Sequence, residues 1–78
     1  MPTRLQGYTY IQAFEHGPLN AEQRREARRR AGYGPTGGWY RGALAHLLEW
    51  TDERKLLTRL RPEGHEYLAT CRAEGYGQ

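Results

Sequence analysis

The sequence predicts one small domain that is mainly α-helical and carries one short β-hairpin. Two stretches begin with the spacing of a helix capping box, and their apolar residues recur at helical intervals. A third stretch, LLTRLR at residues 56–61, alternates apolar and polar residues up to Pro62, as a short exposed strand does. With 78 residues, the chain has room for one thin core. We therefore expect residues 1–78 to form a single domain whose tail, residues 73–78, frays.

The first helix is expected in the stretch TRLQGYTYIQAFEHG. Thr3 and Gln6 have the spacing of a capping box, and the helix should end near His16 and Gly17. The alternation within residues 7–14 leaves a strand open as the other possibility. The apolar residues that fall roughly on one helical stripe are Leu5, Tyr8, Ile11 and Phe14.

The second helix is expected in the stretch LNAEQRREARRRAG. Asn20 is a favourable N-cap with Gln23 three residues later, and Gly32 supplies a stop. Glutamates come early and arginines late, as the helix dipole prefers. Ala27 and Ala31 form the stripe that this helix can bury, so it should approach its neighbour closely.

A third helix is expected at about residues 36–50, after a turn rich in glycine and proline. Its opposite face carries small residues and Arg41, so another surface could come close to the helix backbone. At intervals of about 100°, the residues that share the apolar arc are Tyr40, Ala43, Leu44, Leu47, Leu48 and Trp50.

The last segment is expected to be a turn, a strand and a closing helix. TDERK at residues 51–55 is a polar turn, and residues 56–61 follow as the strand. Pro62 suits the first turn of a helix that ends near Gly75. The strand places two sets of residues on opposite sides, Leu56, Thr58 and Leu60 against Leu57, Arg59 and Arg61.

The charge pattern has its strongest feature in RREARRR, within the second helix of a chain whose net charge is +3. One interpretation is a solvated helix face, because Glu26 can pair with Arg29 and Arg30, and Glu22 with Arg25. The other is contact with phosphates, for which Arg28 is the first candidate because it lies outside those pairings. The sequence leaves both interpretations open.

Catalysis, metal binding and a bound cofactor are not expected. The three histidines lie in different segments, and Cys71 is the only cysteine, so no metal-ligand spacing occurs. No nucleophile, base and orienting group converge, which argues against an enzyme. The single cysteine fits a reducing compartment, and we see neither a signal peptide nor a membrane span, so we expect a cytoplasmic protein without membrane contact.

The stretch LRPEGHEYL at residues 60–68 resembles the final strand and closing helix of bacterial winged helix-turn-helix regulators. In that family, a strand ends in a Leu-x-Pro-x-Gly run before a helix with an aromatic residue and a leucine. The resemblance implies a three-helix core with a wing and a C-terminal helix. It also implies binding to double-stranded DNA as a small transcriptional regulator of a prokaryote or phage.

The resemblance further implies a DNA-binding surface. The helix at about residues 36–50 would lie in the major groove, with Arg41, Thr36 and Trp39 near base edges. Contacts to phosphates would position the domain without specifying a sequence. The residues expected to make them are Arg28, Arg29, Arg30, Arg54 and Lys55.

The alternative function is a winged-helix module that binds protein in a transcription or replication complex without reading DNA sequence. The modest net charge and the acidic residues of TDERK favour it. The tyrosines exceed what a thin core can hide, so some should line a partner or homodimer surface. The tyrosines in question are Tyr8, Tyr10, Tyr33, Tyr67 and Tyr76.

Overall fold

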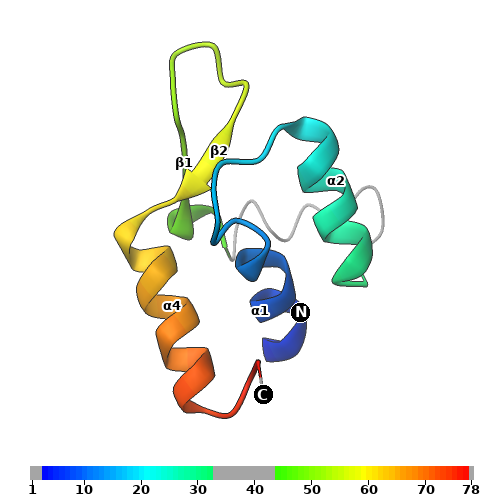
Figure 1. Ribbon diagram of the computed structural model, residues 1–78, viewed down its shortest axis with the longest axis vertical. Coiled ribbons are helices and arrows are strands. Elements are labelled where there is room, and N and C mark those ends of the chain that lie inside the picture. The colour runs from blue at the N-terminus through cyan, green and yellow to red at the C-terminus, as the bar shows by residue number, and fades with distance from the viewer. Residues whose placement is uncertain (1–2, 33–43, 78) are drawn as a thin grey trace.

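The computed structural model describes residues 3–32 and 44–77 of the chain. These residues form three α-helices, a 3-10 helical turn and a two-stranded antiparallel hairpin (Figure 1). The expected combination of helices with one short hairpin is therefore confirmed. In chain order the elements are α1 (Arg4–Gln12), α2 (Ala21–Arg30), the 3-10 helix η1 (Ala45–Leu47), β1 (Leu48–Trp50), β2 (Thr58–Leu60) and α4 (Pro62–Ala73).

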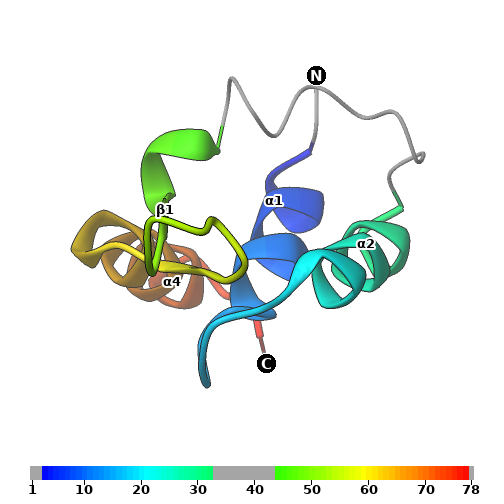
Figure 2. The ribbon, with the colours of Figure 1, turned by 90° about the horizontal axis from the view of Figure 1, so that it is seen from above.

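Helix α1 lies in the middle of the molecule, with α4 on one side and α2 on the other (Figure 1; from above, Figure 2). The hairpin projects from one end of this layer of helices. The core lies where α1 meets its neighbours. Its largest fully buried side chains are Tyr10, Phe14, Ile11, Leu68 and Cys71.

Helix α1 begins at a complete capping box, which decides between helix and strand for this segment. The Thr3 hydroxyl accepts a hydrogen bond from the Gln6 amide at 3.1 Å, and the Gln6 side chain accepts one from the Thr3 amide at 2.9 Å. Of the expected stripe, Tyr8, Ile11 and Phe14 are buried, whereas Leu5 in the first turn is exposed. The predicted helix is confirmed, but its predicted end near His16 and Gly17 is wrong: the last helical residue is Gln12, and turns follow it.

Helix α2 also has the predicted caps and the predicted buried stripe. Asn20 and Gln23 exchange the two hydrogen bonds of a capping box, at 2.8 and 2.9 Å. Ala27 and Ala31 are buried, and their small side chains let α2 lie close to α1. Gly32 has φ +87°, a left-handed conformation that suits glycine and ends the helix.

The expected helix at residues 36–50 is wrong over its second half. Residues 36–43 lie outside the described residues, but η1 covers only Ala45–Leu47 and the chain then enters β1. The leucines of this segment fit a helical period, yet pairing with β2 gives the backbone other hydrogen-bond partners. Leu44 and Leu47 are buried as expected, whereas Trp50 is 46% exposed.

The hairpin pairs β1 with β2 in antiparallel register, with Glu49 opposite Arg59 at its centre. On its other edge, β2 is bridged to Leu19, the residue before the α2 cap. Two backbone hydrogen bonds make this bridge, from the Leu19 amide to the Thr58 carbonyl at 2.8 Å and from the Thr58 amide to the Leu19 carbonyl at 2.9 Å. The strand β2 is therefore held from both sides.

The predicted strand at residues 56–61 is shorter in the structure. Thr58 and Leu60 are buried and Arg59 is exposed, which confirms the alternation within β2. Leu56 and Leu57 belong to the loop between the strands and are 57% and 37% exposed. The loop is thus longer than TDERK and carries two exposed leucines.

Helix α4 begins at Pro62, as predicted, and packs against η1 and β2 through Gly64. A Cβ atom at Gly64 would lie 2.7 Å from the Leu47 carbonyl oxygen and 2.8 Å from the Leu60 side chain. Both distances are shorter than a carbon atom tolerates. Glycine is therefore required here for close packing.

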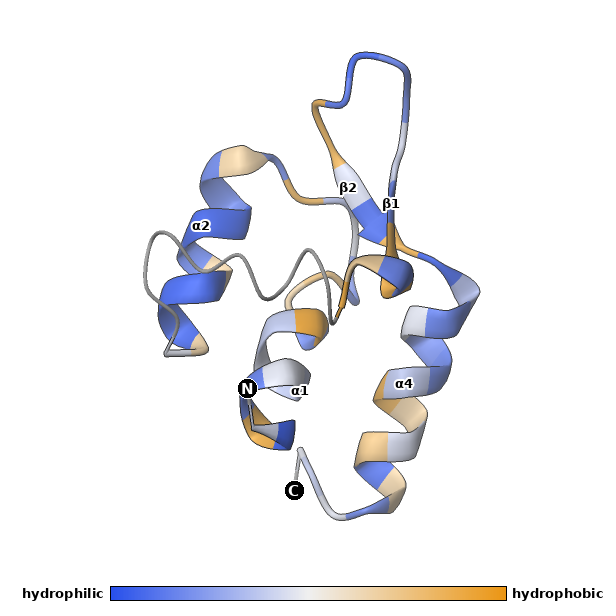
Figure 3. Cartoon of the chain, turned by 180° about the vertical axis from the view of Figure 1, so that it is seen from behind, coloured by the Kyte–Doolittle hydropathy of each residue, from blue (hydrophilic) through white to orange (hydrophobic). Residues whose placement is uncertain are grey.

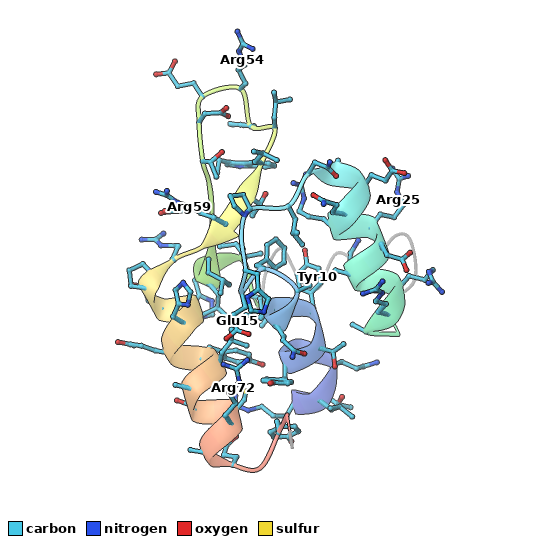
Figure 4. The ribbon with its side chains drawn as sticks, in the orientation of Figure 1. Tyr10, Glu15, Arg25, Arg54, Arg59 and Arg72 are labelled. Carbon is cyan, nitrogen blue, oxygen red and sulfur yellow. The ribbon has the colours of Figure 1, made fainter. Side chains whose placement is uncertain are left out.

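The C-terminal end of α4 is tied to α1 by Arg72. Its guanidinium donates to the two carboxylate oxygens of Glu15 at 2.6 and 2.7 Å and to the Tyr8 hydroxyl at 3.2 Å (Figure 4). Beyond the helix, Tyr76 packs 5.9 Å from the Tyr8 ring, centroid to centroid. The segment that we expected to fray thus has contacts with the core as far as Gly77, which lies against the Tyr8 hydroxyl.

Glu15→Gln should lower the free energy of unfolding at neutral pH by up to about 1 kcal/mol, the range of a solvent-accessible ion pair. The Arg72 hydrogen bonds lower the pKa of Glu15. A carboxylate with a lowered folded pKa stabilises the fold above its unfolded pKa, about 4.3, and this contribution disappears as the pH falls through the folded pKa. Urea denaturation should show the difference between variant and wild type shrinking from about pH 7 to about pH 3.

Glu66→Gln, at an exposed position of α4, is the matched control and should change stability little at either pH. If Glu15→Gln destabilises the protein equally at both pH values, the Arg72 contact acts through packing and not through charge.

Candidate nucleic-acid interface

The exposed arginines of α2 form the most basic surface in the described part of the chain. Five arginines and two glutamates in this helix leave three net positive charges. Figure 3 shows α2 as almost wholly hydrophilic apart from its alanines. A capped helix is a rigid support, so these side chains have defined starting points. This surface can attract a polyanion.

Arg25 and Arg29 lie one helical turn apart, on the side of α2 away from the alanine stripe. Both are exposed, and Figure 4 shows Arg25 pointing outward from the helix. Among the described residues, Arg25 has no carboxylate within ion-pair distance, so its charge is fully available. The sequence predicted a pairing of Arg25 with Glu22, and the described residues show no such ion pair. The position of Arg25 opposite Ala27 on the helix was a usable signal of its exposure.

Glu26 neutralises part of this surface by pairing with two arginines. Its carboxylate oxygens lie 2.5 and 2.9 Å from Arg29 nitrogens and 3.3 Å from Arg30 Nε. The Arg29 hydrogen bonds, with a smaller effect of Arg30, lower the pKa of Glu26 to about 2. The carboxylate is therefore charged at neutral pH, and this pairing is the one predicted for a solvated helix face.

Arg28 is placed differently from the arginines on either side. It is half-buried, and its Nε atom is out of contact with solvent. Arg28 was the first candidate from the sequence because it lay outside the predicted pairings with glutamate, but position on the helix also decides access. An incoming phosphate would reach Arg25 or Arg29 more easily than Arg28.

Arg54 and Lys55 lie at the tip of the hairpin, well away from the C-terminal end of α2 (Figure 4). Both are exposed, and so are Asp52 and Glu53 beside them. Two acidic and two basic side chains leave the tip without net charge. Lys55 has φ 57°, a left-handed conformation in this turn. The structure thus does not bring the two sets of expected phosphate ligands into one patch.

A contact between Arg24 and Trp50 fixes α2 next to the hairpin. The guanidinium carbon of Arg24 lies 5.1 Å from the Trp50 ring centroid, and Arg24 Nη1 donates to the Leu19 carbonyl at 2.9 Å. This contact joins the start of α2 and the residue before its cap to the hairpin, which is distant in sequence. It was not predicted, because it depends on the hairpin packing beside α2.

The expected base contacts Thr36, Trp39 and Arg41 lie outside the described residues. Among the tyrosines, Tyr8 and Tyr10 are buried, and Tyr67 and Tyr76 are half-buried against the core. Tyr33 lies outside the described residues, and the other four tyrosines of the predicted set do not form an exposed surface. The hairpin instead exposes three large apolar side chains, which are Trp50, Leu56 and Leu57.

Comparison with protein-family models, curated proteins and solved structures gives no match to this chain. Residues 3–32 and 44–77 contain no helix that is both long and apolar enough to cross a bilayer. Within the same residues, no three His, Cys, Asp or Glu side chains gather in a way that could hold a metal ion. A function has to be inferred from the side chains themselves.

The Glu26 carboxyl should titrate at about 2 in a carbon-detected NMR experiment on the folded protein. Arg29→Gln should raise this pKa, because the hydrogen bonds from Arg29 are the largest cause of its lowering. Arg25→Gln is the control, since this arginine does not contact Glu26. A Glu26 pKa that does not respond to Arg29→Gln would contradict the pairing.

Proposed function

We propose that this chain is a small winged-helix domain that binds double-stranded DNA and regulates transcription. The order helix, helix, hairpin, helix in the described residues supports the winged-helix layout. One observation carries the DNA proposal: Arg25 and Arg29 project from a rigid helix, away from its buried stripe. This arrangement suits contact with a phosphate backbone.

Arginines of α2 provide the sequence-independent part of binding. Each guanidinium can donate two hydrogen bonds to one phosphate, and release of counterions favours association at low salt. Arg29 and Arg30 share the Glu26 carboxylate, which weakens their attraction for DNA without removing it. Arg28 and the hairpin residues Arg54 and Lys55 make additional phosphate contacts in this proposal.

Base reading is assigned to residues 36–43. Arg41 can donate two hydrogen bonds to the major-groove edge of guanine, and Thr36 and Trp39 lie nearby in sequence. Residues 45–50 are not part of this segment, since they form η1 and β1. The reading segment is therefore shorter than the sequence suggested.

Arg25→Gln should weaken binding to duplex DNA of any sequence and reduce the slope of log affinity against log salt by about 0.9, the value for one lost phosphate contact. The measurement is fluorescence anisotropy with a labelled random duplex at several salt concentrations. Arg61→Gln is the matched control. It removes the same charge from an exposed arginine beside α4, on the far side of α1 from α2.

Glu26→Gln should have the opposite effect on the same surface. It frees the guanidinium groups of Arg29 and Arg30 from the carboxylate, so it should strengthen DNA binding. If Arg25→Gln and Arg61→Gln reduce the salt slope equally, α2 is not the contact surface. If the wild-type protein does not bind duplex DNA below about 100 µM at low salt, the DNA proposal is lost.

The second candidate is a protein-binding module, and the exposed apolar surface of the hairpin favours it. Trp50, Leu56 and Leu57 are three of the four large apolar side chains exposed in the described residues. They lie close together in sequence, next to a tip without net charge. Surfaces of this kind occur at protein interfaces. The partner would be a second copy of this chain or a component of a transcription complex.

Leu56→Ser together with Leu57→Ser should abolish self-association if the hairpin joins two copies. Sedimentation equilibrium of the wild type should give a mass above that of one chain, and the double variant should give a monomer. Leu5→Ser is the matched control, since Leu5 is 58% exposed but lies in α1. A wild type that remains monomeric at all accessible concentrations would rule out the homodimer.

A further inference from the structure

A cavity of about 380 Å³ lies between the hairpin, η1, α1 and α2, and the proposed DNA contacts do not use it. Its size falls within the range of small-molecule sites, which begin at roughly 300 Å³. Tyr10 reaches it from α1, beneath the base of the hairpin (Figure 4). The other lining residues are Arg24, Ala45, Leu48, Glu49, Trp50 and Thr58.

Most of the cavity wall is apolar. Trp50 supplies a large aromatic surface that is only partly covered, with 46% of the residue exposed. Leu48 and Ala45 extend this wall along the start of the hairpin. A flat apolar group could cover the exposed ring and remove both surfaces from water.

Arg24 gives the cavity a positive charge. Its Nη1 atom donates to the Leu19 carbonyl, and the guanidinium faces the Trp50 ring, but no carboxylate in residues 3–32 and 44–77 pairs with it. A guanidinium has five N–H donors, so donors remain for a ligand. Trp50 and Arg24 together offer an aromatic surface beside a cation.

Glu49 also lines the cavity, but its charge is balanced. Arg59 Nε lies 2.6 Å from a Glu49 carboxylate oxygen, across the centre of the hairpin. The acidic group therefore offsets little of the Arg24 charge. Thr58, which is buried, also lines the cavity.

We propose that this cavity binds a small aromatic carboxylate. The ring lies against Trp50 and Leu48, and the carboxylate accepts hydrogen bonds from the remaining donors of Arg24. A cationic ligand would be repelled by Arg24. A neutral ligand would leave the positive charge of Arg24 without a counter-charge. This inference goes beyond DNA binding and does not depend on it.

Binding at this place would also connect two elements of the molecule. Arg24 belongs to α2 and Trp50 to the hairpin, so one ligand would contact both. The ligand would hold the hairpin against the basic helix. The site therefore has the position of an effector site, within a chain of 78 residues.

The test uses naphthalene-2-carboxylate as the probe, with 2-naphthalenemethanol and 2-naphthylmethylammonium as neutral and cationic analogues. Binding is followed by ¹H–¹⁵N NMR of the wild-type chain, including the Trp50 indole N–H signal, and by calorimetry. The carboxylate should bind with a Kd below about 1 mM, and the two analogues at least tenfold more weakly. Equal binding of carboxylate and alcohol, or no shift of the Trp50 signal with the carboxylate, overturns the proposal.

Three variants locate the site. Arg24→Gln should weaken the carboxylate at least tenfold and leave the alcohol unchanged, whereas Arg25→Gln, one residue along and outside the cavity, should change neither. Ala45→Leu enlarges a side chain that lines the cavity while Arg24 itself is unchanged, and it should weaken both ligands. If Arg24→Gln loses the fold by circular dichroism, Ala45→Leu decides alone: unchanged carboxylate affinity in that variant overturns the proposal.

Discussion

The backbone bridge between Leu19 and Thr58 sets how the hairpin lies against the start of α2. It uses two hydrogen bonds, and it brings the segment between α1 and α2 onto the free edge of β2. Asn20, the next residue, caps α2, so the start of that helix is set by the bridge. The hairpin and α2 therefore keep a defined relation. The cavity beside Arg24 depends on this relation, because α2 and the hairpin both line it.

Two kinds of contact strengthen the same arrangement from different sides. Arg24 binds the Leu19 carbonyl and faces Trp50, so it ties α2 to both the linker and the hairpin. At the opposite end of the molecule, Arg72 ties α4 to α1 through Glu15 and Tyr8. Arginine suits both places because its planar group can make several directed contacts at once. Some arginines of this basic chain are thus structural, and others face solvent.

The sequence predicted the elements whose signals are local. The capping boxes at Thr3 and Asn20 and the proline at the start of α4 act over three or four residues, and all three predicted helix starts are confirmed. Residues 44–50 were misassigned because their leucines fit a helix while a distant strand supplies the hydrogen bonds. The cavity beside Arg24 could not be predicted, since its walls come from four separate segments. Arg25 could have been found from its position opposite the alanine stripe.

The packing around Gly64 limits how far the run LRPEG can serve as evidence of common ancestry. The glycine is needed because α4 crosses the Leu47 carbonyl and the Leu60 side chain with no room for a methyl group. Any helix that closes a core against a strand at this distance needs the same small residue, whatever the protein binds. A leucine, proline and glycine at these spacings can therefore arise independently, by convergence on one packing solution. Identical residues in this run therefore show a shared packing requirement and are weak evidence of common ancestry.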